Sequence, residues 1–151
     1  MLSDLDDLYQ QVILDHGRKP RNFHAIDGAD AHAEGYNPLC GDRVTIYIKR
    51  DNGHITDAAF TGKGCAICTA SASMMTQTLK GRTVEEARRS FDEFHHMLTD
   101  ESFTPQRIEA LGKLAVFAGV KKYPIRVKCA TLPWHTFKAA LDHRAEPVST
   151  E

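Results

Sequence analysis

The chain has 151 residues, of which 42% are hydrophobic and 26% are charged, and its formal net charge at pH 7 is −1. This length and composition are typical of one globular domain with its own core, and the balanced charge argues against a nucleic-acid-binding surface. No apolar run reaches the length of a membrane span, so we expect neither nucleic acid nor a membrane as a partner.

The start of the chain gives no indication of export. Residues 1–7 are acidic and contain neither the basic start nor the apolar stretch of a signal peptide. We therefore expect a cytoplasmic protein, in which thiols stay reduced. Four cysteines in that compartment are expected to be buried, reactive or bound to metal rather than paired in disulfides.

The first half of the chain predicts one helix followed by a small antiparallel sheet. Apolar residues recur at helical spacing from Leu2 to Ile13, and Gly17 ends that helix. A turn at Asn52-Gly53 joins the second and third extended segments as a hairpin. The predicted extended segments are residues 32–36, 43–50 and 55–61.

The second half predicts helices that cover this sheet. The small residues from Cys65 to Leu79 predict a closely packed helix, and Thr83 with Glu86 forms a capping box that begins another, running to about Leu98. Further predicted segments are a helix from Pro105 to about Gly119, an extended run over 123–128, and a last helix after Cys129 with Pro133 in its first turn. The expected fold class is α+β, with about three strands in one domain over residues 1–145 and a frayed tail over 146–151.

Three of the cysteines lie where a thiol is expected to react or to bind metal. Cys40 lies on a loop rich in glycine and proline between two predicted strands. Cys65 follows a glycine-rich turn at the start of a predicted helix, where the helix dipole lowers the pKa of a thiol. Cys129 is placed at another predicted helix start, behind Arg126 and Lys128, whose charges also favour thiolate. For one cysteine at a helix start, the role of a small buried residue is favoured, but two at helix starts together with one on a loop strengthen the case for metal or sulfur chemistry.

Asp42 and Cys68 each have two interpretations. Asp42 follows Cys40 by two residues, and Gly-Asp pairs usually form turns, so the residues alone favour a turn over a ligand. Cys68 lies on the same helix face as Cys65, and Cys65-x-x-Cys68 is compatible with a metal pair or a redox pair. The chain has no second knuckle of a zinc ribbon, however, so simple packing beside the site is favoured for Cys68.

Three separate cysteine motifs occur in a characteristic order: Asn-Pro-Leu-Cys-Gly-Asp at residues 37–42, Gly-Lys-Gly-Cys-Ala-Ile-Cys-Thr-Ala-Ser-Ala-Ser-Met-Met at 62–75, and Arg-Val-Lys-Cys-Ala-Thr-Leu at 126–132. With further matches at 8–16 and 20–22, they resemble the U-type iron–sulfur scaffold family, the NifU N-terminal/IscU/SufU group. The resemblance covers nearly the full chain. It implies a SufE/NifU-like α+β fold, in which helices cover a small antiparallel sheet.

Two departures favour one branch of this group. IscU-type members have a histidine immediately before the third cysteine, where this chain has Lys128. They also have a Leu-Pro-Pro-Val-Lys segment recognised by a chaperone, where this chain has Lys-Tyr-Pro-Ile-Arg at 122–126. The interval from Cys65 to Cys129 is longer than in IscU, as it is in SufU. The resemblance is therefore to SufU-like proteins.

A SufU-like protein implies sulfur transfer in iron–sulfur cluster assembly. Cys40 is implied to leave a bound zinc ion and to accept persulfide sulfur from a SufS-like, pyridoxal-phosphate-dependent cysteine desulfurase, which the protein stimulates. The sulfur then passes to other SUF assembly proteins or to apo iron–sulfur proteins, and we expect the protein to be a monomer. The zinc ligands implied by the resemblance are Cys40, Asp42, Cys65 and Cys129.

Two other functions are compatible with the same residues. In the first, the four groups hold iron or a [2Fe–2S] cluster, and the protein is a scaffold that assembles clusters and transfers them. In the second, Cys68 replaces Asp42 in a purely structural zinc site, although a chain of this length needs no metal to build its core. Thiolates with a carboxylate suit zinc or iron with sulfide, so donor chemistry alone leaves these functions open.

Overall fold

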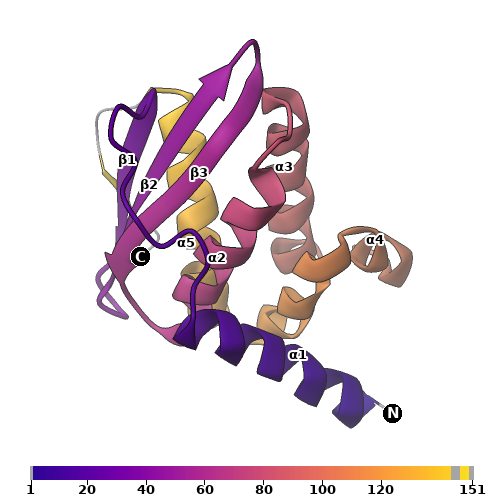
Figure 1. The fold of residues 1–151 in the computed structure, drawn as a ribbon. Coiled ribbons are helices and arrows are strands. Elements are labelled where there is room, and N and C mark those ends of the chain that lie inside the picture. The colour runs from indigo at the N-terminus through magenta and orange to yellow at the C-terminus, as the bar shows by residue number, and fades with distance from the viewer. Residues whose placement is uncertain (1, 144–146, 150–151) are drawn as a thin grey trace.

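Helices cover one face of a small sheet in the computed structural model, which describes residues 2–143 and 147–149 (Figure 1). The strand order is β3-β2-β1-β4; the β1–β2 and β2–β3 pairs are antiparallel, whereas the short β4 pairs in parallel with β1. The strands are β1 (Ala31–Asn37), β2 (Asp42–Asp51), β3 (His54–Lys63) and β4 (Val148–Ser149). The helices are α1 (Leu2–Arg18), α2 (Ala66–Leu79), α3 (Val84–Thr99), α4 (Pro105–Ala110), the 3₁₀ helix η1 (Gly112–Lys122) and α5 (Pro124–Leu141). The predicted α+β class is confirmed.

The hairpin predicted at Asn52-Gly53 joins β2 to β3. Asn52 has a φ angle of 52° and Gly53 has one of 78°. Two successive residues in this left-handed region are typical of a type I′ turn, whose twist matches that of the strands it joins. Pairing then continues along both strands as far as Arg43 opposite Lys63.

The strand β1 is built so that α5 can approach it closely. Its side chains alternate between buried and exposed, and the buried positions include Ala31, Ala33 and Gly35. A Cβ atom on Gly35 would lie 2.0 Å from Oγ1 of Thr136 in α5, so this contact requires glycine. The helix α5 therefore packs directly on the strand that leads to Cys40.

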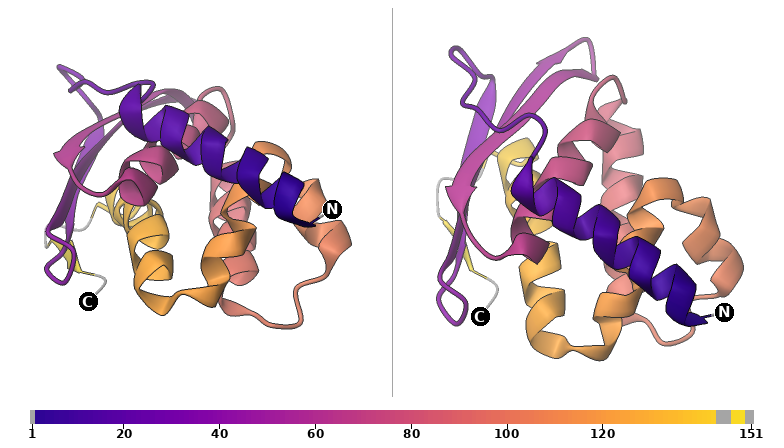
Figure 2. Two further views of the ribbon diagram at one scale, coloured as in Figure 1. Left: turned by 90° about the horizontal axis from the view of Figure 1, so that it is seen from below. Right: turned by 60° about the horizontal axis from the view of Figure 1, so that its bottom comes forward.

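The helix α2 packs against α1, α5 and β3 and is buried along most of its length (Figure 2). Its small side chains permit this close packing, as predicted. Ser71 Oγ donates a 2.5 Å hydrogen bond to the carbonyl oxygen of Ala130 in α5. Ser73 Oγ accepts a 2.9 Å hydrogen bond from the backbone N–H of Arg21, just beyond α1. These bonds hold α2, and Cys65 at its N-terminus, against both neighbouring helices.

The capping box predicted at Thr83 is formed at the start of α3. Thr83 Oγ1 accepts the Glu86 N–H at 3.0 Å, and the Glu86 carboxylate accepts the Thr83 N–H at 3.1 Å. On its apolar side, α3 presents Phe94, which stacks on Trp134 of α5 with ring centroids 4.7 Å apart. The helix α3 thus extends the core beyond α5.

Two segments of the second half differ from their prediction. The helix predicted from Pro105 to Gly119 ends at Ala110, because Gly112 has a φ angle of 62° and this left-handed conformation ends an α-helix. The chain continues as η1. The run over 123–128, predicted to be extended, forms the first turns of α5 with Pro124 in the first turn, where a missing N–H leaves no bond unmade.

The start of α5 also changes the position of Pro133, which was predicted for the first turn of the last helix. It lies inside α5, where it is buried. Because proline has no N–H, it cannot donate the usual helix bond to the carbonyl of Cys129, four residues earlier. The backbone around Cys129 is therefore held by fewer bonds within its own helix.

Part of the tail predicted to be frayed forms the strand β4. Val148 lies opposite Gly35 and Ser149 opposite Tyr36. Of the rest of that predicted tail, residue 147 has no regular structure, and residues 146, 150 and 151 lie outside the described residues. Across the described part of the chain, no helix combines the length and the apolarity needed to cross a bilayer.

Candidate functional site

Two thiols and a carboxylate converge where β1, β2 and α5 meet. Cys40 lies on the turn between β1 and β2, Asp42 is the first residue of β2, and Cys129 lies in α5. One ligand atom from each of the three lies within 4.8 Å of the others. The Sγ atoms of Cys40 and Cys129 are 3.4 Å apart. The fold thus joins the first and third of the cysteine motifs.

Asp42 faces the interior and does not serve the turn that the residues alone had favoured. It is in phase with Val44 and Ile46 on the buried face of β2, and only 1% of its surface is exposed. Oδ1 accepts a 2.8 Å hydrogen bond from the backbone N–H of Cys65, and Oδ2 lies 3.8 Å from Cys65 Sγ. Asp42 therefore connects the second cysteine motif to the first.

Cys65 is the N-cap residue of α2, which agrees with its predicted position at the start of a helix. Its Sγ accepts a 3.4 Å hydrogen bond from the backbone N–H of Cys68. The hydrogen bond with the Cys129 thiol, opposed by burial and assisted by the Cys68 N–H, lowers the pKa of Cys65 to about 7. Of the two neighbouring thiols, Cys65 is the one that ionises first.

Cys129 differs from its prediction in both position and ionisation. It lies inside α5, not at a helix start, and it is 3% exposed. Its pKa is raised, first by the hydrogen bond with Cys65 and then by burial. The guanidinium of Arg126, expected to favour a Cys129 thiolate, instead lies over the ring of Tyr123 at 4.5 Å. Cys129 is therefore the weaker acid of the two hydrogen-bonded thiols.

Cys68, like Cys65, lies outside the group of three ligand atoms that converge. Its side chain is 3% exposed and belongs to the apolar core. Burial is the largest cause of its raised pKa. It contacts the site through its backbone N–H, which donates a hydrogen bond to Cys65 Sγ.

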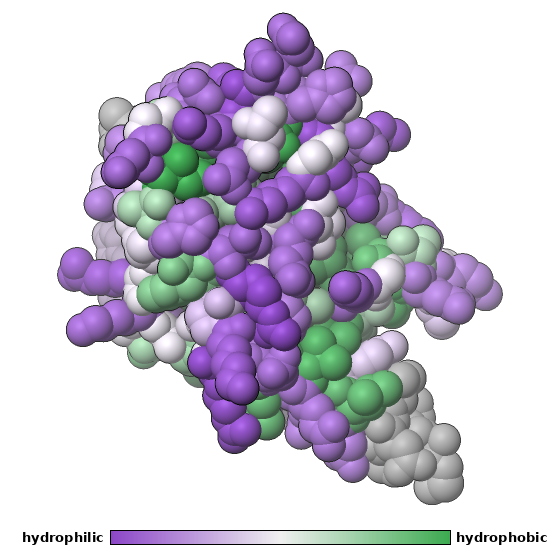
Figure 3. All heavy atoms as spheres, in the orientation of Figure 1, coloured by the Kyte–Doolittle hydropathy of each residue, from purple (hydrophilic) through white to green (hydrophobic). Residues whose placement is uncertain are grey.

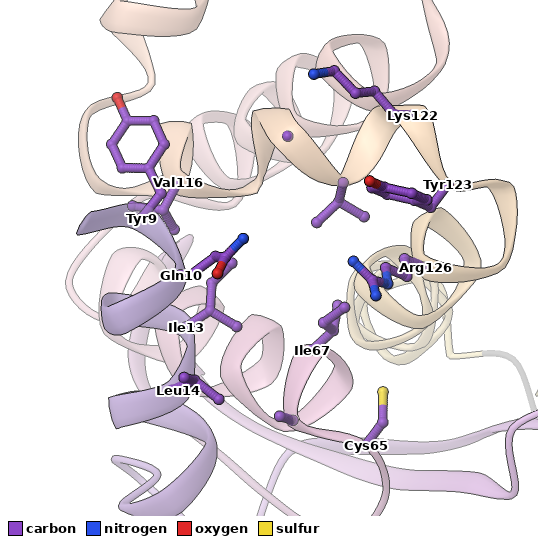
Figure 4. Close-up of a pocket in the computed structure, with 13 residues that line it drawn as sticks. Tyr9, Gln10, Ile13, Leu14, Cys65, Ile67, Val116, Lys122, Tyr123 and Arg126 are labelled. Atoms are coloured by element: carbon purple, nitrogen blue, oxygen red, sulfur yellow. The ribbon is translucent and has the colours of Figure 1, made fainter. Parts of the chain in front are cut away.

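A groove of about 480 Å³, which the sequence did not predict, ends at Cys65 (Figure 4). It lies between α1, the start of α2, η1 and the start of α5, and the sulfur of Cys65 points toward it. Apolar surface continues along α1, where Leu8 and Leu14 are 55% and 43% exposed (Figure 3). The exposed leucines of α1 are the sequence feature that could have indicated this groove. Its main lining residues are Tyr9, Ile13, Leu14, Ile67, Val120 and Arg126.

The donors fit a zinc ion. Three thiols and one carboxylate make a four-ligand set, and zinc–sulfur bonds of about 2.3 Å in a tetrahedron separate two sulfurs by roughly 3.8 Å. The Cys40–Cys129 sulfur separation of 3.4 Å and the 3.8 Å between Cys65 Sγ and Asp42 Oδ2 are close to such spacings. Cys40, Asp42, Cys65 and Cys129 would hold the ion, and the same sulfur-rich set is chemically suitable for iron with sulfide.

A family model described as the NifU-like N terminal domain matches residues 8–130. The chain is 42% identical over 132 residues to the zinc-dependent sulfurtransferase SufU of Bacillus subtilis, covering 87% of this chain and 88% of that protein. It is 40% identical over 144 residues to the iron–sulfur cluster assembly scaffold protein IscU of Streptococcus pyogenes, covering 95% and 89%.

The fold agrees with these sequence matches. A crystal structure of the N-terminal part of a nitrogen-fixing NifU-like protein from Brucella abortus superimposes with a TM-score of 0.80 at 28% identity, covering 93% of this chain and 98% of that one. The described sheet and helices are thus those of a NifU-like domain. The chain belongs to the NifU-like N-terminal domain family, the iron–sulfur cluster assembly scaffold and SufU proteins.

Proposed function

We propose that the protein binds zinc and transfers sulfur in iron–sulfur cluster assembly. In this proposal it accepts sulfur on Cys40 from the persulfide of a pyridoxal-phosphate-dependent cysteine desulfurase and passes it to downstream assembly proteins or apo iron–sulfur proteins. The observation that carries the proposal is that Cys40 is on a turn at the surface, whereas Cys129, 3.4 Å from it, is buried.

The turn makes Cys40 the accessible thiol of this pair. Cys40 is half-buried, and Gly41 after it has a φ angle of 70°, which glycine adopts without strain. Leu39 before it is 66% exposed, so the turn presents an apolar side chain that a docking protein can cover. A donor protein can therefore reach Cys40 without opening the core around Cys129.

The transfer step needs one nucleophilic thiolate. Cys40 Sγ attacks the outer sulfur of the donor's persulfide, a new S–S bond forms on Cys40, and the donor's S–S bond breaks. The electron pair of the broken bond returns to the donor's cysteine as a thiolate, so the exchange is balanced without another reactant. Zinc held by the four donors would keep the thiols deprotonated at neutral pH and protect them from oxidation.

Mass spectrometry after incubation with a cysteine desulfurase, pyridoxal phosphate and cysteine tests the acceptor. Trypsin separates Cys40, Cys129 and the Cys65/Cys68 pair into the peptides 22–43, 129–138 and 64–80. We expect one additional sulfur on peptide 22–43, and we expect Cys40→Ala to abolish uptake of sulfur by the intact protein. Normal uptake by Cys40→Ala would overturn the assignment of the acceptor.

A scaffold for a [2Fe–2S] cluster is the second candidate, because the same donors suit iron and the 40% identical relative is named a scaffold protein. Anaerobic reconstitution with iron and sulfide separates the two. A stable cluster that moves to an apo-ferredoxin would favour the scaffold, whereas retained zinc without a cluster would favour sulfur transfer. The purely structural zinc site is less well supported, because the convergent group of ligand atoms contains Asp42 and not Cys68.

A further inference from the structure

We propose that Cys65 and Cys68 form a redox pair in which Cys68 releases sulfur carried on Cys65 as hydrosulfide. The proposal rests on the proposed function, because it needs a sulfur atom delivered as persulfide. It adds a chemical step that acceptance and onward transfer do not provide. It also gives a role to the fourth cysteine, which the donor set leaves unused.

The step is needed because persulfide sulfur and cluster sulfur differ in oxidation level. The outer sulfur of a persulfide is formally at the level of elemental sulfur, whereas a [2Fe–2S] cluster contains sulfide. Each sulfur atom must therefore gain two electrons before it can enter a cluster. Oxidation of two thiols to one disulfide supplies that pair of electrons.

The geometry places the two cysteines as an outer and an inner thiol. Cys65 is half-buried, lines the groove and caps α2, whereas Cys68, one turn further, is 3% exposed. The backbone N–H of Cys68 donates a 3.4 Å hydrogen bond to Cys65 Sγ, so the backbone of the inner cysteine already contacts the sulfur of the outer one. Residues three apart at the start of a helix lie on one face.

Cys65 is also close to the proposed acceptor. Its Sγ is 3.8 Å from Asp42 Oδ2, in the carboxylate that lies beside Cys40 and Cys129. Sulfur on Cys40 can pass to Cys65 by the same thiol–persulfide exchange that loaded it. Cys68, by contrast, is behind Cys65 in the core, so it is placed to react with what Cys65 carries and not with the donor protein.

The release step balances without another reactant. Cys68 Sγ attacks Cys65 Sγ, a Cys65–Cys68 bond forms, and the bond from Cys65 Sγ to the outer sulfur breaks. The outer sulfur leaves with the electron pair and the proton of the Cys68 thiol, as hydrosulfide. That sulfur is reduced by two electrons, and the two cysteine sulfurs are oxidised by one each. A dithiol reductant then regenerates the pair for another cycle.

The test uses the full-length protein, treated with a chelator and then loaded with inorganic polysulfide, the excess being removed by gel filtration. Released sulfide is measured over time, and alkylated tryptic peptides are weighed. In the wild type we expect peptide 64–80 to become lighter by two hydrogen atoms and to resist alkylation as sulfide appears. Cys68→Ala should keep the additional sulfur on that peptide and release sulfide at least about tenfold more slowly.

Two further variants keep the test decisive. Cys68→Ser replaces the thiol by a hydroxyl, and circular dichroism identifies whichever of the two Cys68 variants is folded. The double variant with Cys40→Ser and Cys129→Ser retains only Cys65 and Cys68 of the four cysteines, and it should still release sulfide with the disulfide in peptide 64–80. Release that is unchanged in a folded Cys68 variant would overturn the proposal. So would sulfide appearing with a crosslink between peptides 22–43 and 129–138 while peptide 64–80 keeps two thiols.

Chemical loading separates this proposal from the function on which it rests. If a desulfurase fails to load Cys40 but polysulfide-loaded protein forms the Cys65–Cys68 disulfide, sulfur transfer from that enzyme is wrong and the redox pair stands. If the desulfurase loads Cys40 but folded Cys68→Ala releases sulfide at the wild-type rate, the redox pair is wrong and the transfer function stands.

Discussion

Asp42 Oδ1 accepts a 2.8 Å hydrogen bond from the backbone N–H of Cys65, a residue 23 positions later in the chain. The carboxylate thus fixes the start of α2 relative to the start of β2, while its second oxygen remains directed toward the sulfur of Cys65. The two contacts give this buried carboxylate a structural role, and the proposed function adds a role as a zinc ligand; substitutions can separate the two.

We expect Asp42→Asn and Asp42→Ala to differ in what they lose. Asparagine keeps an oxygen that can accept the Cys65 N–H but has no charge, so it should weaken zinc retention by about tenfold or more while the fold keeps most of its stability. Alanine also leaves a buried N–H without a partner, which should lower the free energy of unfolding by about 1–3 kcal/mol. Zinc competition with a chelator and urea unfolding measure the two effects. Zinc retention unchanged in both variants would remove Asp42 from the donor set.

Gly64→Ala should disturb the site through Asp42. A Cβ atom at residue 64 would lie 2.8 Å from Asp42 Oδ1, so the carboxylate or the turn before Cys65 must shift. We expect a loss of about 1–3 kcal/mol in the free energy of unfolding, with faster loss of zinc to a chelator. Gly119→Ala is the matched control, because its Cβ would meet nothing within 4 Å. Equal behaviour of the two variants would contradict this prediction.

Cys68→Ser should keep about one zinc ion per chain, whereas Cys65→Ser should lose most of it. Cys65 Sγ is 3.8 Å from Asp42 Oδ2, whereas the thiol of Cys68 makes no hydrogen bond with the donors among the described residues. Metal analysis of both proteins after gel filtration distinguishes the two. The reverse result, with zinc lost only from Cys68→Ser, would support the purely structural zinc site.

His135 should make the folded protein less stable in mild acid. Burial, followed by the charges of His95 and Lys138, lowers the pKa of His135 from 6.5 to about 4. Below pH 6.5 the histidine is therefore protonated in the unfolded chain but still neutral in the folded protein. The free energy of unfolding falls as the pH decreases, until the pH approaches 4.

The corresponding variant is His135→Gln, which has no titrating group at this position. Between about pH 7 and about pH 5, the wild type should lose on the order of 1 kcal/mol more unfolding free energy than the variant. Urea unfolding of chelator-treated proteins measures this difference without a contribution from metal binding. The same pH dependence in both proteins would show that His135 does not contribute.

Local signals made much of the fold predictable. The hairpin required only two left-handed residues at Asn52-Gly53, and the start of α3 required only the reciprocal bonds of Thr83 and Glu86. Such signals lie within a few residues of one another, so the sequence displays them completely. The start of α5 has no side-chain cap, and the strand propensity of Ile125 and Val127 favoured an extended run. Pro124 at the first helical position was the opposing signal.

The sequence named the residues of the candidate site but did not reveal how the fold arranges them. The motif order identified Cys40, Cys65 and Cys129, yet the sequence placed Cys129 at a helix start and favoured a turn role for Asp42 from the residues alone. Both errors have one cause. Cys40 and Cys129 are 89 positions apart, and the burial and hydrogen bonds that determine their surroundings arise only when β2, α2 and α5 pack together.

The place of Cys129 in the last helix also sets the order in which the site can be completed during synthesis. Cys40, Asp42 and Cys65 precede residue 66, whereas α5 leaves the ribosome after all the other helices. A nascent chain therefore exposes two thiols and a carboxylate before Cys129 and the rest of α5, which covers them, have been made. Because the proposed ligand set is complete only after α5 has been made, tight retention of a metal ion would mark chains in which this domain has been both synthesised and folded.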